Sequence, residues 1–278
     1  MPTVVKPRHR PDETSALVTL DPLSSHGRQV KSVERVRDLG EVFTPPKTVQ
    51  AMLDLLPAEM WSVHPSPTFL EPACGDGNFL VAILDRKLAR VGHEQASGRL
   101  PAGEDRDAVA FHALEALSSI YAVDISVENI VGGTPGHEVG ARDRLVTLLR
   151  GWLSATTGAR LTDRSPLVRS ARWIVERNVQ VANMLATNAD GTPSGRDELP
   201  LVEYRWHAEH SALELATTTL GAVMAAATEE TAAAASLFGA PKPTTVWSGA
   251  FNRLHEAPIV APVMRVTSPR NGNGYRGR

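Results

Sequence analysis

The sequence predicts an α/β fold, in which short buried strands alternate with helices. Three short apolar runs are typical of strands, at residues 68–71, 120–125 and 179–181. Between them apolar residues recur three and four positions apart, as in Leu145, Leu148 and Leu149, which is the helical period. The 278 residues, 42% of them apolar, suffice for one such domain with extensions.

The N-terminal residues precede this alternating region. Residues 1–29 are polar and interrupted by prolines, so we expect a disordered basic arm. A short charged helix is expected from Val30 to Leu39. A second helix is expected to begin at Thr44 and Pro45, where Thr44 is a suitable N-cap. Its buried face would carry Val49, Met52, Leu53 and Leu56.

The first strand leads into a glycine-rich turn and a helix. The strand ends at Glu71, Gly75 and Gly77 follow, and helical spacing begins at Asn78. Glycines let the backbone turn tightly and approach a ligand closely. The helix that follows directs its N–H groups and the positive end of its dipole at that ligand. The pattern therefore indicates a binding loop, with Glu71 placed to hold an ammonium group.

Further elements follow in alternation. A helix is expected around residues 109–117, with His112 on its surface. The second strand ends in Asp124, and Ser126 is expected to cap the next segment. Helices are expected at 142–153 and 167–176, and the third strand then leads to Asn183.

The C-terminal part is predicted to extend this core. A fourth strand is expected at residues 199–206, which completes a core of residues 30–206. Residues 207–266 are expected to form an Ala-rich helical extension, with one further strand near 258–266. Residues 267–278 are expected to be a disordered tail.

Two stretches together resemble a known family. The run Glu71-Pro-Ala-Cys-Gly-Asp-Gly-Asn-Phe79 resembles motif I of the adenine-specific DNA methyltransferases. The run Gly-Glu-Val-Phe43-Thr-Pro45, about 30 residues earlier, resembles motif X of the same enzymes. Asp124 and Ile125 resemble motif II. The dinucleotide-binding fingerprint fits less well, because Leu80 stands where it requires a third glycine.

The resemblance implies a Rossmann-like methyltransferase core that binds S-adenosyl-L-methionine. Motif X would line the methionine end, Asp124 would accept bonds from the ribose hydroxyls, and Ile125 would lie against the adenine. Asn183 stands where motif III usually has Asp and would take the adenine amino group. The cofactor-binding residues so implied are Phe43, Thr44, Pro45, Glu71, Pro72, Ala73, Gly75, Gly77, Phe79, Asp124, Ile125 and Asn183.

The chain departs from the family at the catalytic motif. Family members end their fourth strand with Asn, Asp or Ser, then Pro-Pro and an aromatic residue that stacks on a flipped base. This tetrapeptide is absent from the chain. In its place stand Glu203, Tyr204, Arg205 and Trp206, of which Glu203, Tyr204 and Trp206 are the candidate catalytic residues. The C-terminal half of the sheet is also expected to be shortened.

Composition limits the classes of function. With a formal net charge of −2, the protein as a whole does not attract DNA, so any DNA contact would have to come from local basic patches. The single cysteine, Cys74, excludes a disulfide framework and a Cys-based zinc site, and we expect no metal. The sequence contains no apolar run of membrane-spanning length and no signal peptide, so we expect a cytoplasmic protein without membrane contact.

The leading hypothesis is a methyltransferase that transfers a methyl group to an amino nitrogen of DNA. The chain shows no separate target-recognition domain, so a specificity or partner subunit would supply sequence recognition. One alternative is a methyltransferase-like accessory protein of a phage or restriction–modification system, which binds the cofactor without catalysis. Another is a methyltransferase acting on a substrate other than DNA.

Overall fold

The computed structural model describes residues 44–101, 105–134, 138–225 and 245–258. Several predictions lie outside the described residues: the basic arm, the helix at 30–39, Phe43, the Ala-rich segment beyond residue 225, and the strand and tail beyond residue 258. None of the described helices is long and apolar enough to cross a membrane.

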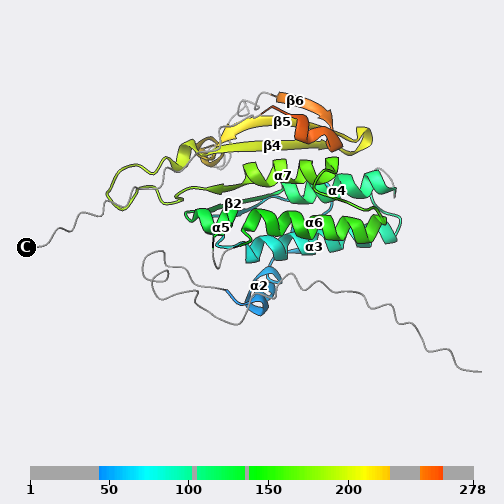
Figure 1. Ribbon diagram of the computed structural model, residues 1–278, viewed down its shortest axis with the longest axis horizontal. Helices are drawn as coiled ribbons and strands as arrows, with labels where there is room; N and C mark the ends of the chain where they lie inside the picture. Colours follow the sequence, from blue (N-terminus) through cyan, green and yellow to red (C-terminus); the bar gives the residue numbers. More distant parts are fainter. Residues whose placement is uncertain (1–43, 102–104, 135–137, 226–244, 259–278) are drawn as a thin grey trace, which may run out of the picture.

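The described helices and strands alternate along the first two-thirds of the chain (Figure 1). The helices are α2 (Pro46–Leu53), α3 (Asn78–Ala96), α4 (Arg106–Ser118), α5 (Val127–Val131), α6 (Ala141–Thr157) and α7 (Pro166–Asn178). The strands are β1 (Phe69–Glu71), β2 (Ile120–Asp124), β3 (Val179–Val181), β4 (Pro200–His207), β5 (Ala212–Thr219) and β6 (Thr245–Ala250). Helices form at the expected positions 109–117, 142–153 and 167–176. The second helix ends at Leu53, and Met52, which was expected on its buried face, is 50% exposed.

The strands β1, β2 and β3 form a parallel sheet in that order. Phe69 pairs with Ile120, and Asp124 pairs with Val181, so the carboxyl ends of all three strands lie at one edge. The predicted mixed α/β class, with a parallel sheet and intervening helices, is confirmed. Glu71 and Asp124 stand at the ends of neighbouring strands, which is where open α/β sheets bind ligands.

The fourth strand does not join this sheet, which corrects the sequence prediction. β4 pairs antiparallel with β5, and β5 pairs antiparallel with β6, in a second three-stranded sheet. Gln180 Nε2 donates to the Pro200 carbonyl at 2.7 Å, and Tyr121 Oη donates to the Val202 carbonyl at 2.5 Å. Further along β4, Tyr204 contacts Asn178, just before β3, and Trp206 contacts Ser118, two residues before β2. The strand β4 therefore runs opposite to β2 and β3.

The strand β5 replaces the first part of the predicted Ala-rich helix. Leu213 and Leu215 are fully buried two positions apart, which is the period of a strand. Residues 217–219 are three threonines, whose branched Cβ atoms favour a pleated strand over a helix. High alanine content was therefore a poorer guide here than the alternation of the leucines.

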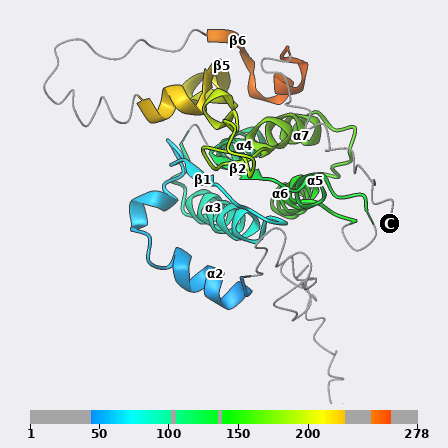
Figure 2. The same cartoon turned by 90° about the vertical axis from the view of Figure 1, so that its left-hand side faces the viewer.

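Three layers result (Figure 1). The antiparallel sheet lies over α4 and α7, and α3 and α6 lie beneath them. α4 ends at Ser118 and α7 at Asn178, and β2 and β3 begin within two residues of these ends. In Figure 2, β1 and β2 lie between the antiparallel sheet above and α3 and α6 below.

The helix α4 lies at the centre of the molecule. It packs against α3, α6 and α7, and Phe111 meets Trp206 of β4 edge to face at 5.0 Å between ring centroids. Every residue from Ala108 to Ser118 is buried. His112 is 0% exposed, so the prediction of a surface histidine is wrong. The cause is that neighbours surround this helix on all sides.

Candidate functional site

A hydrogen bond joins the glycine-rich turn to the end of the second strand. Gly75 N–H donates to Asp124 Oδ2 at 2.9 Å. Gly75 has φ +55° and Gly77 has φ +90°, both in the left-handed region that glycine adopts without strain. A Cβ added at Gly75 would meet no atom within 4 Å, so open space lies beside this residue.

Other groups of the protein use most of the Asp124 carboxylate. Oδ1 accepts bonds from Ser126 N–H at 2.8 Å and from Asn129 Nδ2 at 3.2 Å. An ionised carboxylate offers about four acceptor positions, so three protein bonds leave about one for a ligand. The acceptance of bonds from the ribose hydroxyls by Asp124 remains a prediction, for which the protein bonds leave room at about one position. The same bonds hold the carboxylate fixed at the sheet edge.

The second glycine of the turn serves packing. A Cβ on Gly77 would lie 2.9 Å from the Cβ of Ala141, at the start of α6. Arg144, one helical turn further along α6, donates to the Asp76 carbonyl at 2.7 Å and to Asn78 Oδ1 at 2.9 Å. Its guanidinium also lies 3.3 Å from Asp76 Oδ1. Arg144 thus clamps the turn and the first residue of α3.

Sequence reasoning did not identify Arg144. It is one of several arginines on an amphipathic helix, and nothing in its local pattern points to a loop 66 residues away. Arg144 reaches the turn because the start of α6 packs closely against Gly77, at Ala141.

The carboxylate of Glu71 lies half-buried at the end of β1. Its Oε1 accepts the Ala73 N–H at 3.3 Å. Burial raises the pKa of the Glu71 carboxyl, and the bond from Ala73 opposes this in part. A cation beside Glu71 would recover electrostatic energy that burial removes. Pro72 and Ala73 are exposed, while Phe79 is half-buried against the hydrophobic core.

The residues predicted to surround the nucleoside lie at or after the same sheet edge. Ile125 is 54% exposed, so its side chain is open to a ligand. The side chain of Asn183 is engaged locally, because Oδ1 accepts Leu185 N–H at 3.0 Å and Nδ2 donates to Asn188 Oδ1 at 3.1 Å. Its contact with an adenine remains a prediction.

The motif X segment begins α2. The helix starts at Pro46 and its N-cap is Pro45, without a side-chain cap bond, so the predicted capping by Thr44 is wrong. α2 packs on α3, where Arg86 donates to Gln50 and Asp54 at 2.7 Å each. Whether Thr44 and Pro45 contact the cofactor remains a prediction.

The candidate catalytic residues lie at the opposite end of the parallel sheet. Tyr204 Oη donates to Asn178 Oδ1 at 2.9 Å, and Trp206 Nε1 donates to Ser118 Oγ at 2.9 Å. Asn178 and Ser118 precede β3 and β2, so these contacts are at the amino ends of the strands. The fourth strand was expected to complete the core, but β4 runs in the reverse direction, so its candidate catalytic residues lie away from the glycine-rich turn.

Two of the cavities lined by described residues lie away from the glycine-rich turn. One of about 300 Å³ lies at the amino ends of the strands, between residues 64–68, α4 and β4. Glu203, Tyr204 and Trp206 line it, together with His64 and Glu115. The other, of about 310 Å³, is more apolar and lies between β1 and the antiparallel sheet. The catalytic candidates thus share a cavity with one another, but with none of residues 71–79.

Comparisons with known proteins leave the family open. The chain matches no protein-family model. Searches of curated proteins and of solved structures gave no match either. The methyltransferase resemblance therefore rests on the motif residues of the chain and on their arrangement at the sheet edge.

Proposed function

We propose that the chain binds S-adenosyl-L-methionine at the carboxyl edge of its parallel sheet, in a Rossmann-like core related to the adenine-specific DNA methyltransferases. The bond between Gly75 N–H and Asp124 Oδ2 carries this proposal, because it unites the glycine-rich turn with the neighbouring strand end. Open space beside Gly75 leaves room for a ligand. Glu71 supplies a carboxylate for the ammonium group of the methionine end.

The activity that the resemblance implies is methyl transfer to an amino nitrogen of DNA. S-adenosyl-L-methionine, when bound, would supply an electrophilic methyl group to that nitrogen, with Glu71 holding its ammonium end and Asp124 its ribose. Positioning of the two reactants supplies most of the rate enhancement in such a reaction. The carboxyl edge, where the methionine end would lie, is where the acceptor base has to enter.

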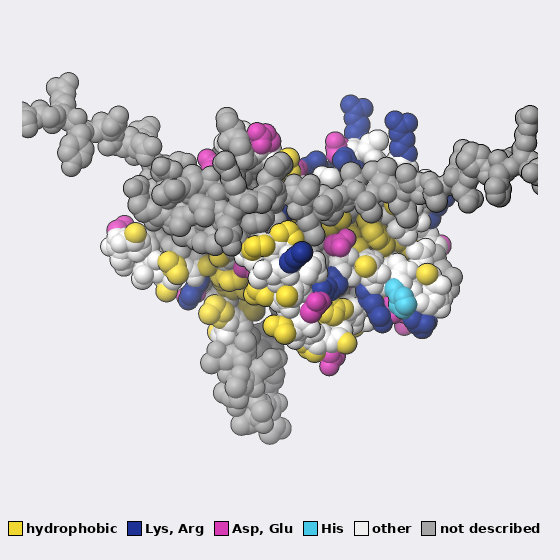
Figure 3. Space-filling model, turned by 90° about the horizontal axis from the view of Figure 1, so that it is seen from below, with side chains coloured by type: hydrophobic (Ala, Val, Ile, Leu, Met, Phe, Trp, Pro, Cys, Tyr) yellow, Lys and Arg dark blue, Asp and Glu magenta, His cyan; other side chains and the backbone are white. Residues whose placement is uncertain are grey.

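A second candidate is a cofactor-binding accessory protein whose catalytic group comes from a partner subunit. The position of Tyr204 and Trp206 favours it, because their polar groups are hydrogen-bonded at the far end of the sheet. On the face drawn in Figure 3, basic and acidic side chains are interspersed. This agrees with the formal net charge of −2 and favours DNA contact through a partner over contact through this face.

Transfer of tritiated methyl groups separates the two candidates. The full chain is incubated with labelled S-adenosyl-L-methionine and unmethylated DNA or RNA, alone and with candidate partner proteins. Label on nucleic acid with the chain alone supports the enzyme. Cofactor binding without transfer, followed by transfer once a partner is added, supports the accessory role. Absence of cofactor binding contradicts both.

A further inference from the structure

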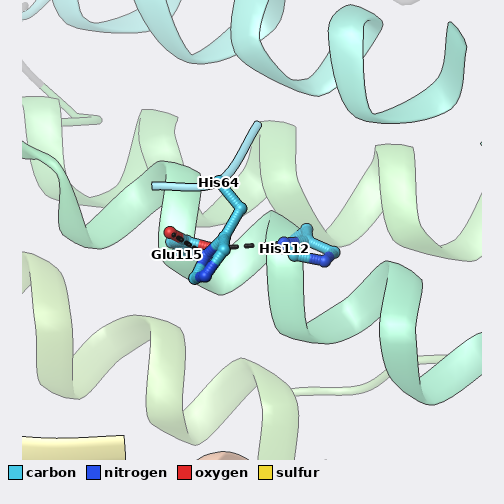
Figure 4. Close-up of side chains that lie close together, drawn as sticks. All are labelled: His64, His112 and Glu115. Carbon is cyan, nitrogen blue, oxygen red and sulfur yellow. Dashed lines mark hydrogen bonds and ion pairs between the residues drawn. The ribbon is translucent and has the colours of Figure 1, made fainter. Parts of the chain in front are cut away.

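Two histidines and a glutamate meet in the interior beside α4 (Figure 4). His112 and Glu115 lie three residues apart on this helix and so project from one face. His64 comes from the segment that precedes β1, and its Nδ1 lies 2.8 and 3.0 Å from the two oxygens of Glu115. Nδ1 of His112 lies 3.0 Å from Glu115 Oε2. One potential ligand atom from each residue falls within 4.8 Å of the others.

The surroundings determine which nitrogen of His112 carries a hydrogen. Nε2 lies 2.8 Å from the carbonyl oxygen of Pro101, which can only accept, so Nε2 carries the hydrogen. In the neutral ring, the lone pair on Nδ1 then faces the carboxylate of Glu115, which also only accepts. Two facing acceptors repel, so this arrangement requires a positive centre between them, either a proton or a metal ion.

Burial makes this requirement stronger. His112 is 0% exposed and Glu115 is 3% exposed, so solvent does little to stabilise the carboxylate. Ser66 N–H donates to Glu115 Oε1 at 3.1 Å and holds the carboxylate in place. The amine of nearby Lys87 donates to Ser66 Oγ and to the Pro67 carbonyl, at 2.8 and 2.6 Å. Burial lowers the pKa of this amine to about 7, although the charge of Glu115 opposes the shift in part, so Lys87 supplies only part of a positive charge near the cluster.

The donor set matches a metal centre in its chemistry. Two imidazole nitrogens and one carboxylate are a common ligand set for catalytic zinc and for non-haem iron(II). Ligating histidines usually donate their second ring N–H to a carbonyl or carboxylate, as His112 does to Pro101. Ligands about 2.0–2.1 Å from a tetrahedral ion lie about 3.3 Å apart. The separation of each histidine nitrogen from Glu115 needs to change by only a few tenths of an ångström, whereas the two histidine nitrogens, which lie within 4.8 Å of each other, must approach by up to about 1.5 Å. His64, whose side chain is 26% exposed, has room to make that shift.

We propose that His64, His112 and Glu115 bind one divalent transition-metal ion, with zinc and iron(II) as the candidate ions. The cavity of about 300 Å³ borders His64 and Glu115, so water or a small ligand can complete the coordination. The site lies at the amino ends of the parallel strands, opposite the glycine-rich turn. It does not depend on the proposed cofactor binding, and it departs from the expectation of no metal.

Metal binding to the full-length chain without an affinity tag tests the proposal. The chelator-treated protein is titrated with Zn²⁺, with Co²⁺, and with Fe²⁺ in the absence of oxygen, by calorimetry and by the visible spectrum of bound Co²⁺. We expect one Zn²⁺ per chain and a Co²⁺ spectrum typical of low coordination number. Mg²⁺, which prefers oxygen ligands, is expected not to compete.

Two variants and a matched control complete the experiment. His64→Ala removes the most exposed ligand and is expected to lower Zn²⁺ affinity by more than the 10–100-fold that loss of an outer-shell partner costs. Glu115→Gln keeps the size of the side chain and should have a similar effect. His93→Ala, on the exposed side of α3, should bind like the wild type. If Glu115→Gln does not fold, His64→Ala alone decides the outcome.

The proposal fails on either of two results. One is that none of the three ions binds at one per chain. The other is that His64→Ala binds Zn²⁺ as tightly as His93→Ala does. In both cases the cluster is a buried hydrogen-bond network in which a proton supplies the positive charge.

Discussion

The backbone N–H of Gly75 and the carboxylate of Asp124 meet at 2.9 Å, although 49 residues separate them in the chain. The bond fixes the glycine-rich turn after β1 to the end of β2. It has two structural consequences: the turn has a defined position at the sheet edge, and Asp124 keeps about one acceptor position for a ligand.

Asp124→Ala is expected to lower both stability and cofactor affinity. The change leaves Gly75 N–H, Ser126 N–H and Asn129 Nδ2 without this acceptor. Hydrogen bonds to a charged group contribute about 1.5–3 kcal/mol each, partly recovered here by water. Urea unfolding should show a loss of at least about 2 kcal/mol. An unchanged unfolding midpoint would show that these bonds do not organise the turn.

Gly75→Val is expected to abolish or strongly weaken cofactor binding. The valine side chain would occupy the open space beside the turn. In addition, position 75 has φ +55°, a backbone conformation that costs an L-residue about 1–2 kcal/mol. Gly158→Val is the matched control, because Gly158 has φ +67° and equal space at the far end of α6. Both variants should lose similar stability, and only Gly75→Val should lose at least tenfold in affinity. Equal cofactor affinities of the two variants would show that the cofactor does not bind at the glycine-rich turn.

Arg144→Ala is expected to loosen the turn and reduce cofactor affinity several-fold. The variant loses the bonds to the Asp76 carbonyl and to Asn78 Oδ1, with a stability loss of about 1.5–3 kcal/mol. Arg142→Ala is the control on the same helix, because Arg142 donates to the Val179 and Glu176 carbonyls instead. It should lose stability and keep its affinity, as measured by urea unfolding and calorimetry. A greater loss of affinity in Arg142→Ala would contradict the clamp.

Cofactor affinity is expected to fall as the pH is lowered. Burial raises the pKa of Glu71, so in the free protein its carboxyl takes up a proton at higher pH than an ordinary glutamate does. The ionised form holds the ammonium group, so affinity is full above that raised pKa and falls about tenfold per pH unit below it. Calorimetry from pH 7 downward measures this profile. Glu71→Gln should bind more weakly at pH 7 with a flatter profile, and identical profiles would exclude Glu71 from the site.

Tyr204→Phe is expected to leave cofactor affinity unchanged. The variant loses the bond from Tyr204 Oη to Asn178 Oδ1, with a stability loss of about 1 kcal/mol. The cause lies in the direction of β4, which carries Tyr204 away from the carboxyl edge. A tenfold fall in cofactor affinity, or in the rate of methyl transfer if any is found, would show that Tyr204 belongs to the active site.

The sequence predicted the elements better than their arrangement. Helical spacing located the long helices, and short apolar runs located β1, β2 and β3. The rule that parallel strands present their carboxyl ends together brought Glu71 and Asp124 to one edge correctly. These successes depend on patterns within one segment, or on a rule that holds for parallel sheets in general.

The errors concern contacts between distant segments. The alternation within β4 is the same for either strand direction, so its reversal could not be read from the residues. The burial of His112 could have been predicted from the sequence. Apolar residues occupy every face of α4, and a helix that is apolar all round lies in the interior of a protein. The spacing of His112 and Glu115 also hinted at the cluster. Only the fold shows that His64 joins them.

Calorimetric titration of the full-length chain with S-adenosyl-L-methionine tests the central claim most directly. The account predicts one molecule bound per chain, in the range of about 1 μM to 1 mM that enzymes use for their substrates. It also predicts at least tenfold weaker binding by Gly75→Val than by Gly158→Val. Absence of binding at about 1 mM, or equal affinity of the two variants, would contradict a cofactor site at the glycine-rich turn.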